Sequence, residues 1–229
     1  QLQFYSSTFN SVEINFTYYA IPSPRIFDSM ASRVPDGFSF AVKAHRSMTH
    51  TRDCPQDDYQ SYTQALDPIV ESGKMGPILL QFPWGFKYSR ANMEYLEQLR
   101  DNLGDLALCV EFRHSSWLRD GVMEFLRQQE LGFCNVDQPR LKTLLPPTGI
   151  ATTGTGYIRF HGRNRANWWK PKEAYMRYDY MYGQEEHIDW MLRIRKAGSH
   201  TEKTHIYFNN HYKAQAARSA KLLQGLFAQ

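Results

Sequence analysis

Short apolar runs rich in β-forming residues alternate with helical patterns along this chain, on average about every 32 residues. One strand with one helix has about this length. The apolar runs occupy residues 12–15, 38–43, 77–82, 106–112, 132–137, 156–162 and 205–210. The helical patterns occupy 24–33, 57–71, 91–103, 117–130, 185–196 and 214–227. Strands that alternate with helices in this way predict a parallel sheet with helices outside it.

The kind of parallel sheet follows from two further observations. The run 77–82 is almost continuously apolar, as expected of a strand buried on both faces. No Gly-x-Gly-x-x-Gly follows the first run, which disfavours a dinucleotide-binding sheet. We therefore predict an α/β fold, a (β/α)8 TIM-type barrel, with residues 1–229 as a single domain.

The strand count is one short of a closed barrel. Only seven strands can be recognised, and Leu2, Phe4, Tyr5 and Phe9 predict a helix directly before the run 12–15. We expect the first strand of the barrel to be missing from this chain. A seven-stranded sheet would then leave backbone groups at 12–15 and 205–210 without partners.

Composition restricts the class of protein. The 229 residues are 42% hydrophobic and 22% charged, and no apolar stretch reaches 18 residues, so we expect no membrane partner. The N-terminus shows no secretory pattern. The three cysteines, Cys54, Cys109 and Cys134, form no Cys-x-x-Cys pair, which argues against disulfides and a thiolate zinc site and indicates a reducing, cytoplasmic location. The net charge of +4 fits an anionic ligand or nucleic acid without requiring either.

Polar side chains gather where the predicted strands end. In a TIM-type barrel the C-terminal ends of the strands carry the chemistry. Alternation along a strand puts Glu111 and Arg113 on one face and Phe112 on the helix-facing side. The candidates selected in this way are Glu13, Asn15, Lys43, Gln81, Glu111, Arg113, His114, Trp117, Asp137, Arg159, His161, Arg163, Asn209 and Asn210. Unpaired burial of so many polar groups would be costly, so they indicate a site. The alternative is an ion-pair network that only fills the barrel.

Several segments resemble one known family. They are 9–19 with Val-Glu-Ile-Asn, 40–50 with Lys43 and His50, Leu-Gln-Phe-Pro at 80–83, Val-Glu-Phe-Arg-His-x-x-Trp at 110–117, Asp-x-Pro at 137–139, Tyr-x-Arg-x-His-Gly-Arg at 157–163 and Phe-Asn-Asn at 208–210. In this order they resemble the YecE-like family, a domain of unknown function numbered seventy-two. The resemblance implies a TIM-type barrel related to sugar-isomerase and endonuclease IV-like barrels, and it implies no established reaction. Family members open with a Gly-x-Ser-Gly-Trp-type strand that is absent here.

Two functions fit these residues best. In the first, the protein binds a small phosphorylated or otherwise anionic substrate and hydrolyses or isomerises it. Lys43, Arg113 and Arg159 would hold the anion, and Glu111 or Asp137 would transfer the proton with His161 as partner. The ligand would be oriented by Asn15, Gln81, Asn209 and Asn210. In the second, the protein is a nucleic-acid-binding barrel, because basic and aromatic residues interleave between 163 and 182. A lid that buries these aromatic residues would explain the same pattern.

Two further ligand classes stay open. A carbohydrate could stack on Trp117, Trp168 or Trp169. A divalent metal could bind the carboxylates and His161 at the strand ends, but the three cations in the same ring would repel it, so we do not favour this cofactor. The sequence predicts no oligomeric state.

Overall fold

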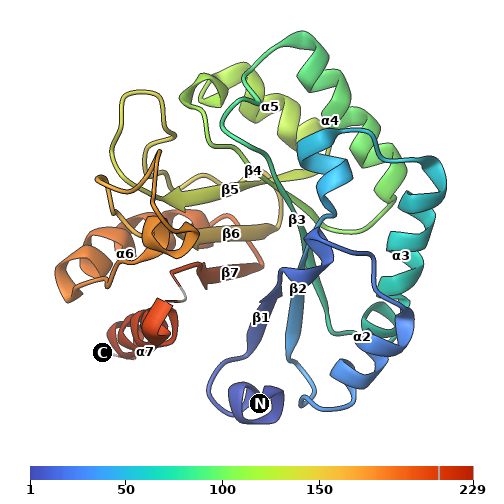
Figure 1. Ribbon diagram of the computed structural model, residues 1–229, viewed down its shortest axis with the longest axis horizontal. Helices are drawn as coiled ribbons and strands as arrows, with labels where there is room; N and C mark the ends of the chain where they lie inside the picture. Colours follow the sequence, from blue (N-terminus) through green and yellow to red (C-terminus); the bar gives the residue numbers. More distant parts are fainter. Residues whose placement is uncertain (211, 229) are drawn as a thin grey trace. The chain divides into compact units, whose positions relative to one another are not determined.

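The protein has the α/β fold that the alternating pattern predicts. The computed structural model describes residues 1–210 and 212–228 (Figure 1). The strands follow one another in the order β1 to β7, and the pairs β1–β2, β2–β3, β5–β6 and β6–β7 are parallel. The fold is therefore of TIM type with seven strands among the described residues, where a (β/α)8 fold has eight. This confirms the predicted fold class and strand count.

The contacts divide the chain into two compact units. Unit 1 comprises residues 1–83 and 88–110, and unit 2 comprises residues 84–87 and 111–229. The boundary lies inside strand β4, at Glu111. The assignment of 1–229 to a single domain stays a prediction, and each unit is described by itself.

Unit 1 contains the first strands and the helices between them. Its strands are β1 (Ser11–Ile14), β2 (Ser39–Lys43), β3 (Met75–Gln81) and most of β4 (Leu108–Glu111). Its helices are α1 (Leu2–Ser6), α2 (Pro24–Ala31), α3 (Gln56–Glu71) and α4 (Arg90–Leu103), with a 3-10 turn η1 (Phe16–Tyr18) and a π-helical turn η2 (Ser47–Thr51). The helix predicted before the first strand is confirmed, although α1 ends before Phe9.

Local chemistry explains where helix α2 begins and ends. Pro24 occupies the first turn of α2, where its missing N–H costs nothing. At the other end of α2, the buried Lys74 Nζ donates to the carbonyl oxygens of Ala31 and Val34 at 2.9 and 3.1 Å. A cation beside C-terminal carbonyls is favourable because these groups have no partner within the helix. Lys74 therefore fastens the end of α2 to the start of β3.

Unit 2 contains the remaining strands and helices. The strands are β5 (Leu131–Asp137), β6 (Thr155–Phe160) and β7 (Lys203–Phe208). The helices are α5 (Asp120–Gln128), α6 (Gln184–Gly198) and α7 (Gln215–Phe227), with 3-10 turns η3 (Ser115–Trp117), η4 (Ala174–Tyr178) and η5 (Tyr212–Ala214). The segment predicted as one helix, 117–130, is thus a 3-10 turn followed by a shorter helix. Arg119 separates them, with an extended backbone at φ −143°.

The core of unit 2 confirms the predicted alternation along β6. Phe160 points to the helix side, where its ring lies 4.9 Å from that of Trp190 in α6 and 4.5 Å from that of Phe208 in β7. Its neighbours Arg159 and His161 point the other way and are also buried. Apolar packing on one face thus fixes the direction of the charged side chains on the other.

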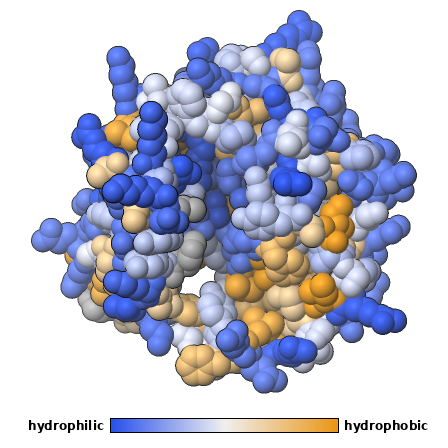
Figure 2. Space-filling model, viewed as in Figure 1, coloured by the Kyte–Doolittle hydropathy of each residue, from blue (hydrophilic) through white to orange (hydrophobic). Residues whose placement is uncertain are grey.

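Part of the apolar surface of unit 1 is exposed. Figure 2 shows hydrophobic residues gathered over the β1 and α2 region, and the exposed large apolar side chains of that segment include Phe16, Tyr19 and Ile26. Among the described residues, no helix is both long and apolar enough to cross a lipid bilayer.

Candidate functional site

Four of the predicted site residues lie in unit 1, where they form two pairs. Asn15 donates to Glu13 Oε1 at 2.9 Å, and Lys43 Nζ donates to Gln81 Oε1 at 2.9 Å. The Lys43 ammonium also lies 4.2 Å from the centre of the Tyr18 ring, a cation–π distance. The sequence therefore identified the residues at the ends of β1, β2 and β3 that interact. The predicted meeting of this group with the group of unit 2 at one mouth stays a prediction.

Glu111 is the centre of the polar group in unit 2. It ends β4 and is fully buried. Its Oε1 lies 2.6 Å from Arg113 Nε and 3.2 Å from His161 Nε2, and its Oε2 lies 2.7 Å from Arg159 Nη1. Glu111 and Arg159 belong to β4 and β6, and Arg113 and His161 follow directly after the ends of these strands. The alternative interpretation of these charges, an ion-pair network, therefore describes Glu111 correctly.

The protonation states in this group follow from burial and charge. Burial alone would raise the pKa of Glu111, but the guanidinium groups of Arg113 and Arg159 outweigh it and hold the pKa well below its usual range. Burial and the charge of Arg113 lower the pKa of His161 to about 3. Near neutral pH, Glu111 is thus an anion and His161 is neutral. We assign the ring proton of His161 to Nε2, which faces Glu111, so that Nδ1 can accept from Asn209 at 3.4 Å.

Asp137, the end of β5, belongs to a second network. Arg163 Nε donates to both of its carboxylate oxygens, at 3.1 and 2.8 Å. Arg163 Nη1 also lies 2.9 Å from Glu186 Oε1, and Tyr180 donates to the same oxygen at 2.7 Å. Burial and the hydrogen bond with Asp137 raise the pKa of Tyr182 well above its usual value, so its hydroxyl stays protonated. Arg163 thus has a structural partner on each side.

Arg113 is the cation whose remaining donors best suit a ligand. Its side chain is 10% exposed. Its Nε pairs with Glu111, and its Nη1 donates to Gln138 Oε1 at 3.3 Å, so that both contacts hold the guanidinium in place. Its guanidinium lies 5.9 Å from the Trp168 ring, and Trp168 in turn contacts Tyr178 edge-on. No described residue accepts a hydrogen bond from its Nη2. A fixed guanidinium with a spare donor beside aromatic rings is suited to an anion.

The basic and aromatic segment 163–182 divides into buried and exposed parts. Trp168 and Tyr182 are buried at 4% and 1% exposure, as the lid interpretation predicts. Trp169 is 49% exposed, and its ring meets that of Trp84 at 5.5 Å. Asn210 Nδ2 donates to the Tyr180 carbonyl oxygen at 2.6 Å and so holds the segment near the end of β7. The burial of Trp168 and Tyr182 agrees with the lid interpretation, and binding of nucleic acid by this segment stays a prediction.

Three predicted ligand-binding residues have structural tasks in unit 2. Trp117 is fully buried, stacks on Phe112 at 4.2 Å and donates to the Phe86 carbonyl oxygen at 2.7 Å, which leaves no ring face for a ligand. His114 Nδ1 accepts from the Ser116 N–H at 3.0 Å and thereby caps η3. Asn210 is fully buried in its bond to the 163–182 segment. A residue that belongs to a motif can thus be required for packing and not for ligand binding.

Three residues that complete these networks were not among the predicted site residues, although Tyr182 belongs to the predicted basic and aromatic segment. Gln138 fixes Arg113, Glu186 pairs with Arg163, and Tyr182 accepts from the Gly162 N–H at 2.8 Å. Only Glu186 carried a local signal, since it lies three residues after Gly183 at the start of α6 and accepts from its N–H at 2.9 Å. The other two are identified by tertiary contacts alone.

The described residues contain no group of three or more His, Cys, Asp or Glu side chains that could hold a metal ion. Around Glu111 the partners are guanidinium groups and a neutral imidazole. Cys109 and Cys134 are buried, as predicted for small core residues, and Cys54 is partly exposed.

Comparison with known proteins identifies the family. The family model described as "Protein of unknown function DUF72" matches residues 1–229. The UPF0759 protein YunF of Bacillus subtilis is 30% identical over an alignment of 237 positions, which covers 96% of this chain and 84% of that protein. The crystal structure of the DUF72 family protein TM1631 of Thermotoga maritima is 39% identical and superposes with a TM-score of 0.90, covering all of this chain and 89% of the other. The DUF72 family protein EF0366 of Enterococcus faecalis, 24% identical, has the same fold, with a TM-score of 0.92 over all of this chain and 88% of the other. The chain belongs to the DUF72 family of proteins of unknown function.

Proposed function

We propose that this protein binds a small phosphorylated or otherwise anionic ligand at the Glu111–Arg113–His161 group of unit 2. The observation that carries the proposal is Arg113, a nearly buried guanidinium that Glu111 and Gln138 hold in place. A guanidinium fixed in advance loses little side-chain entropy when it binds an anion, and its planar fork matches phosphate or carboxylate. The Trp168 ring beside it supplies an apolar wall.

The predicted catalytic residues take different parts in this proposal. Glu111 is too weakly basic to accept a proton near pH 7, because its two guanidinium partners stabilise the carboxylate. It acts as a positioning residue for Arg113 and Arg159. His161 is neutral and donates from Nε2. If the ligand is hydrolysed or isomerised, Asp137 is the carboxylate left for proton transfer, and Arg163 orients it.

Binding to Arg113 can be measured directly. We would titrate the protein with glucose 6-phosphate and with glucose, and follow the indole N–H signal of Trp168 by nuclear magnetic resonance. The phosphate ester should shift this signal with a dissociation constant at least about 10-fold below that of glucose, because one charge-assisted hydrogen bond contributes about this factor. Arg113→Gln should abolish the difference, and Arg113→Lys should retain part of it.

The matched control is Arg127→Gln. Arg127 is half exposed on α5, and its ion-pair partner among the described residues is Glu124 on the same helix. Its loss changes the net charge as Arg113→Gln does, so general electrostatic attraction would show up equally in both variants. Equal affinities of Arg113→Gln and wild-type protein across a panel of phosphate esters would contradict the proposal.

The second candidate is binding of a nucleic acid or carbohydrate on the Trp84–Trp169 pair. The exposed Trp169 ring lies against Trp84, and Lys87 Nζ lies 4.9 Å from the centre of the Trp84 ring. Exposed aromatic rings beside a cation suit a base and its phosphate. A nucleic-acid ligand would be supported if the logarithm of the binding constant for single-stranded DNA falls linearly with the logarithm of the salt concentration, and if Trp169→Ala abolishes this binding. Binding of neutral oligosaccharides without salt dependence would support the carbohydrate.

A further inference from the structure

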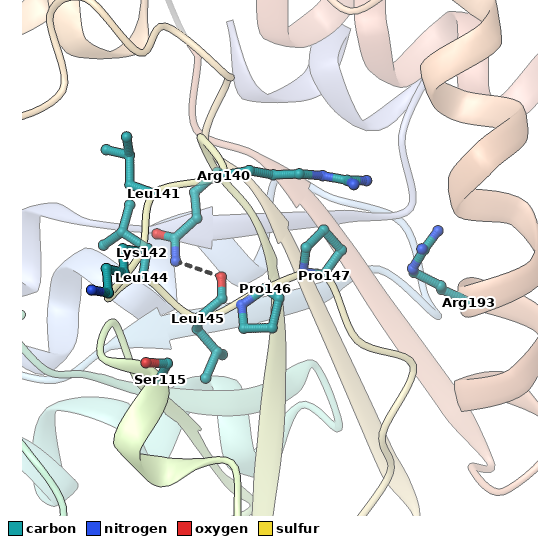
Figure 3. A pocket seen from close by; sticks show the side chains of 10 residues that line it. Ser115, Arg140, Leu141, Lys142, Leu144, Leu145, Pro146, Pro147 and Arg193 are labelled. Atoms are coloured by element: carbon teal, nitrogen blue, oxygen red, sulfur yellow. Dashed lines mark hydrogen bonds between the residues drawn. The ribbon is translucent and has the colours of Figure 1, made fainter.

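A pocket of unit 2 lies where a helix between β5 and β6 would be expected. The connection 138–154 contains no helix and is fastened to the segment after β4. Leu145 N donates to the Arg113 carbonyl oxygen, and Ser115 N donates to the Thr143 carbonyl oxygen, each at 3.0 Å. The pocket beside this connection has a volume of about 610 Å³ (Figure 3), which is within the range of small-molecule sites.

The connection and helix α6 come together at this pocket. A Cβ atom on Gly149 would lie 2.8 Å from the backbone oxygen of Arg193, so glycine is required for this close approach. Arg193 itself is positioned by α6, because its Nη1 donates to the Asp189 carbonyl oxygen at 2.7 Å and its guanidinium lies 5.9 Å from the Trp190 ring. One wall of the pocket is therefore a helix and the other a fastened loop.

The charged side chains of the lining all have the same sign. Arg140, Lys142 and Arg193 line the pocket, and no acidic residue does. Among residues 1–210 and 212–228, none of the three forms an ion pair. In Figure 3, Arg140 from the loop and Arg193 from α6 extend toward each other across Pro147. Guanidinium groups that face one space without an acidic partner attract an anion.

The rest of the lining is mainly apolar. Leucine and proline side chains form it, at Leu141, Leu144, Leu145, Pro146 and Pro147. The polar Gln138 is already engaged, since it donates to the Leu145 carbonyl oxygen at 3.0 Å, shown as the dashed line in Figure 3, and accepts from Arg113. An anionic head and an apolar body are therefore both accommodated.

We propose that this pocket is a binding site for a small organic anion that carries an apolar ring or chain. Arg140 and Arg193 bind its phosphate or carboxylate head, and the leucines and prolines contact its apolar part. The site is separate from the Glu111–Arg113–His161 group, because Gln138 lies between the two and bonds to both Arg113 and the pocket loop. The proposal does not depend on a ligand at Arg113.

The test follows the leucine methyl signals of the pocket by nuclear magnetic resonance, so that binding elsewhere does not contribute. Protein labelled at its leucine methyl groups is titrated with phenyl phosphate, benzoate, benzyl alcohol and inorganic phosphate. At least one of the two aromatic anions should shift the signals of Leu141, Leu144 and Leu145. Its dissociation constant should be at least about 10-fold below those of benzyl alcohol and of inorganic phosphate, because each of these lacks one of the two interactions.

Variants identify the cations that bind. Arg140→Gln and Arg193→Gln should each raise the dissociation constant about 10-fold. Arg195→Gln is the matched control, because Arg195 is exposed on the same helix and is absent from the lining. The inference is overturned if neither aromatic anion shifts the three methyl signals, if benzyl alcohol or inorganic phosphate binds as tightly, or if Arg195→Gln weakens binding as much as Arg193→Gln.

Discussion

Replacing Glu111 by Gln should destabilise the protein strongly. The Arg113 Nε to Glu111 Oε1 distance is 2.6 Å, and the two side chains are 10% and 0% exposed. Arg159 approaches the other oxygen at 2.7 Å and is 2% exposed. A neutral amide would leave these buried guanidinium groups without their carboxylate, and breaking a buried ion pair in this way costs about 3–5 kcal/mol. That is a large share of the roughly 5–15 kcal/mol that stabilises a typical native protein.

The assay is urea unfolding at pH 7, followed by circular dichroism. With an m-value of about 2–3 kcal/mol per molar urea, the midpoint should fall by roughly 1–2.5 M. The control is Glu94→Gln, which breaks the surface pair between Arg90 and Glu94, with side chains 93% and 52% exposed. That change should cost about 0.5 kcal/mol or less and should vanish in 1 M salt, whereas the Glu111→Gln effect should persist. The reasoning is refuted if both variants lose the same small amount of stability.

Three further predictions concern single groups elsewhere in the fold. Lys74→Met should cost about 1–3 kcal/mol in urea unfolding, because it removes a buried cation from two helix-end carbonyl oxygens, and an unchanged midpoint would contradict its role. The pKa of His161 is about 3 in the folded state, below its unfolded value of 6.5, so the unfolded state binds the extra proton. The stability that His161 contributes should therefore be complete above pH 6.5 and fall by up to about 1.4 kcal/mol per pH unit as the pH drops toward 3, with a shallower fall in His161→Gln. Gly162→Ala should destabilise more than Gly73→Ala in thermal unfolding, since both glycines have positive φ but only a Cβ at 162 meets Tyr180 Cβ, at 2.7 Å, and equal losses would contradict this.

Local pattern was sufficient to predict the elements and their order. The apolar run at 77–82 and the amphipathic segment at 91–103 become β3 and α4 with ends within two residues, because periodicity reflects burial directly. At 205–210 both ends are displaced by two residues, because β7 is Lys203–Phe208 and the polar Lys203 gives no strand signal. Alternation also placed Glu111, Arg113, Arg159 and His161 on one side of their strands, as the structure confirms for unit 2.

The roles of those residues could not be predicted from the sequence. Trp117 and Trp169 are both tryptophans near strand ends, yet one is fully buried and the other is half exposed. Gln138 belongs to no motif, and its role is to contact both Arg113 and the loop of the basic pocket. Contacts between residues distant in sequence decide such roles, because burial depends on what packs above a side chain.

The sequence by itself determined the alternation of strands and helices, the TIM-type order of seven strands and the polar residues at their ends. These properties follow from side-chain periodicity, which every segment carries locally. The tertiary structure alone decided that Glu111 is a buried anion between two guanidinium groups, that His161 is neutral, and that a basic pocket forms beside 138–147. Charge state and pocket shape depend on desolvation and on partners brought together by folding, and no local pattern contains them.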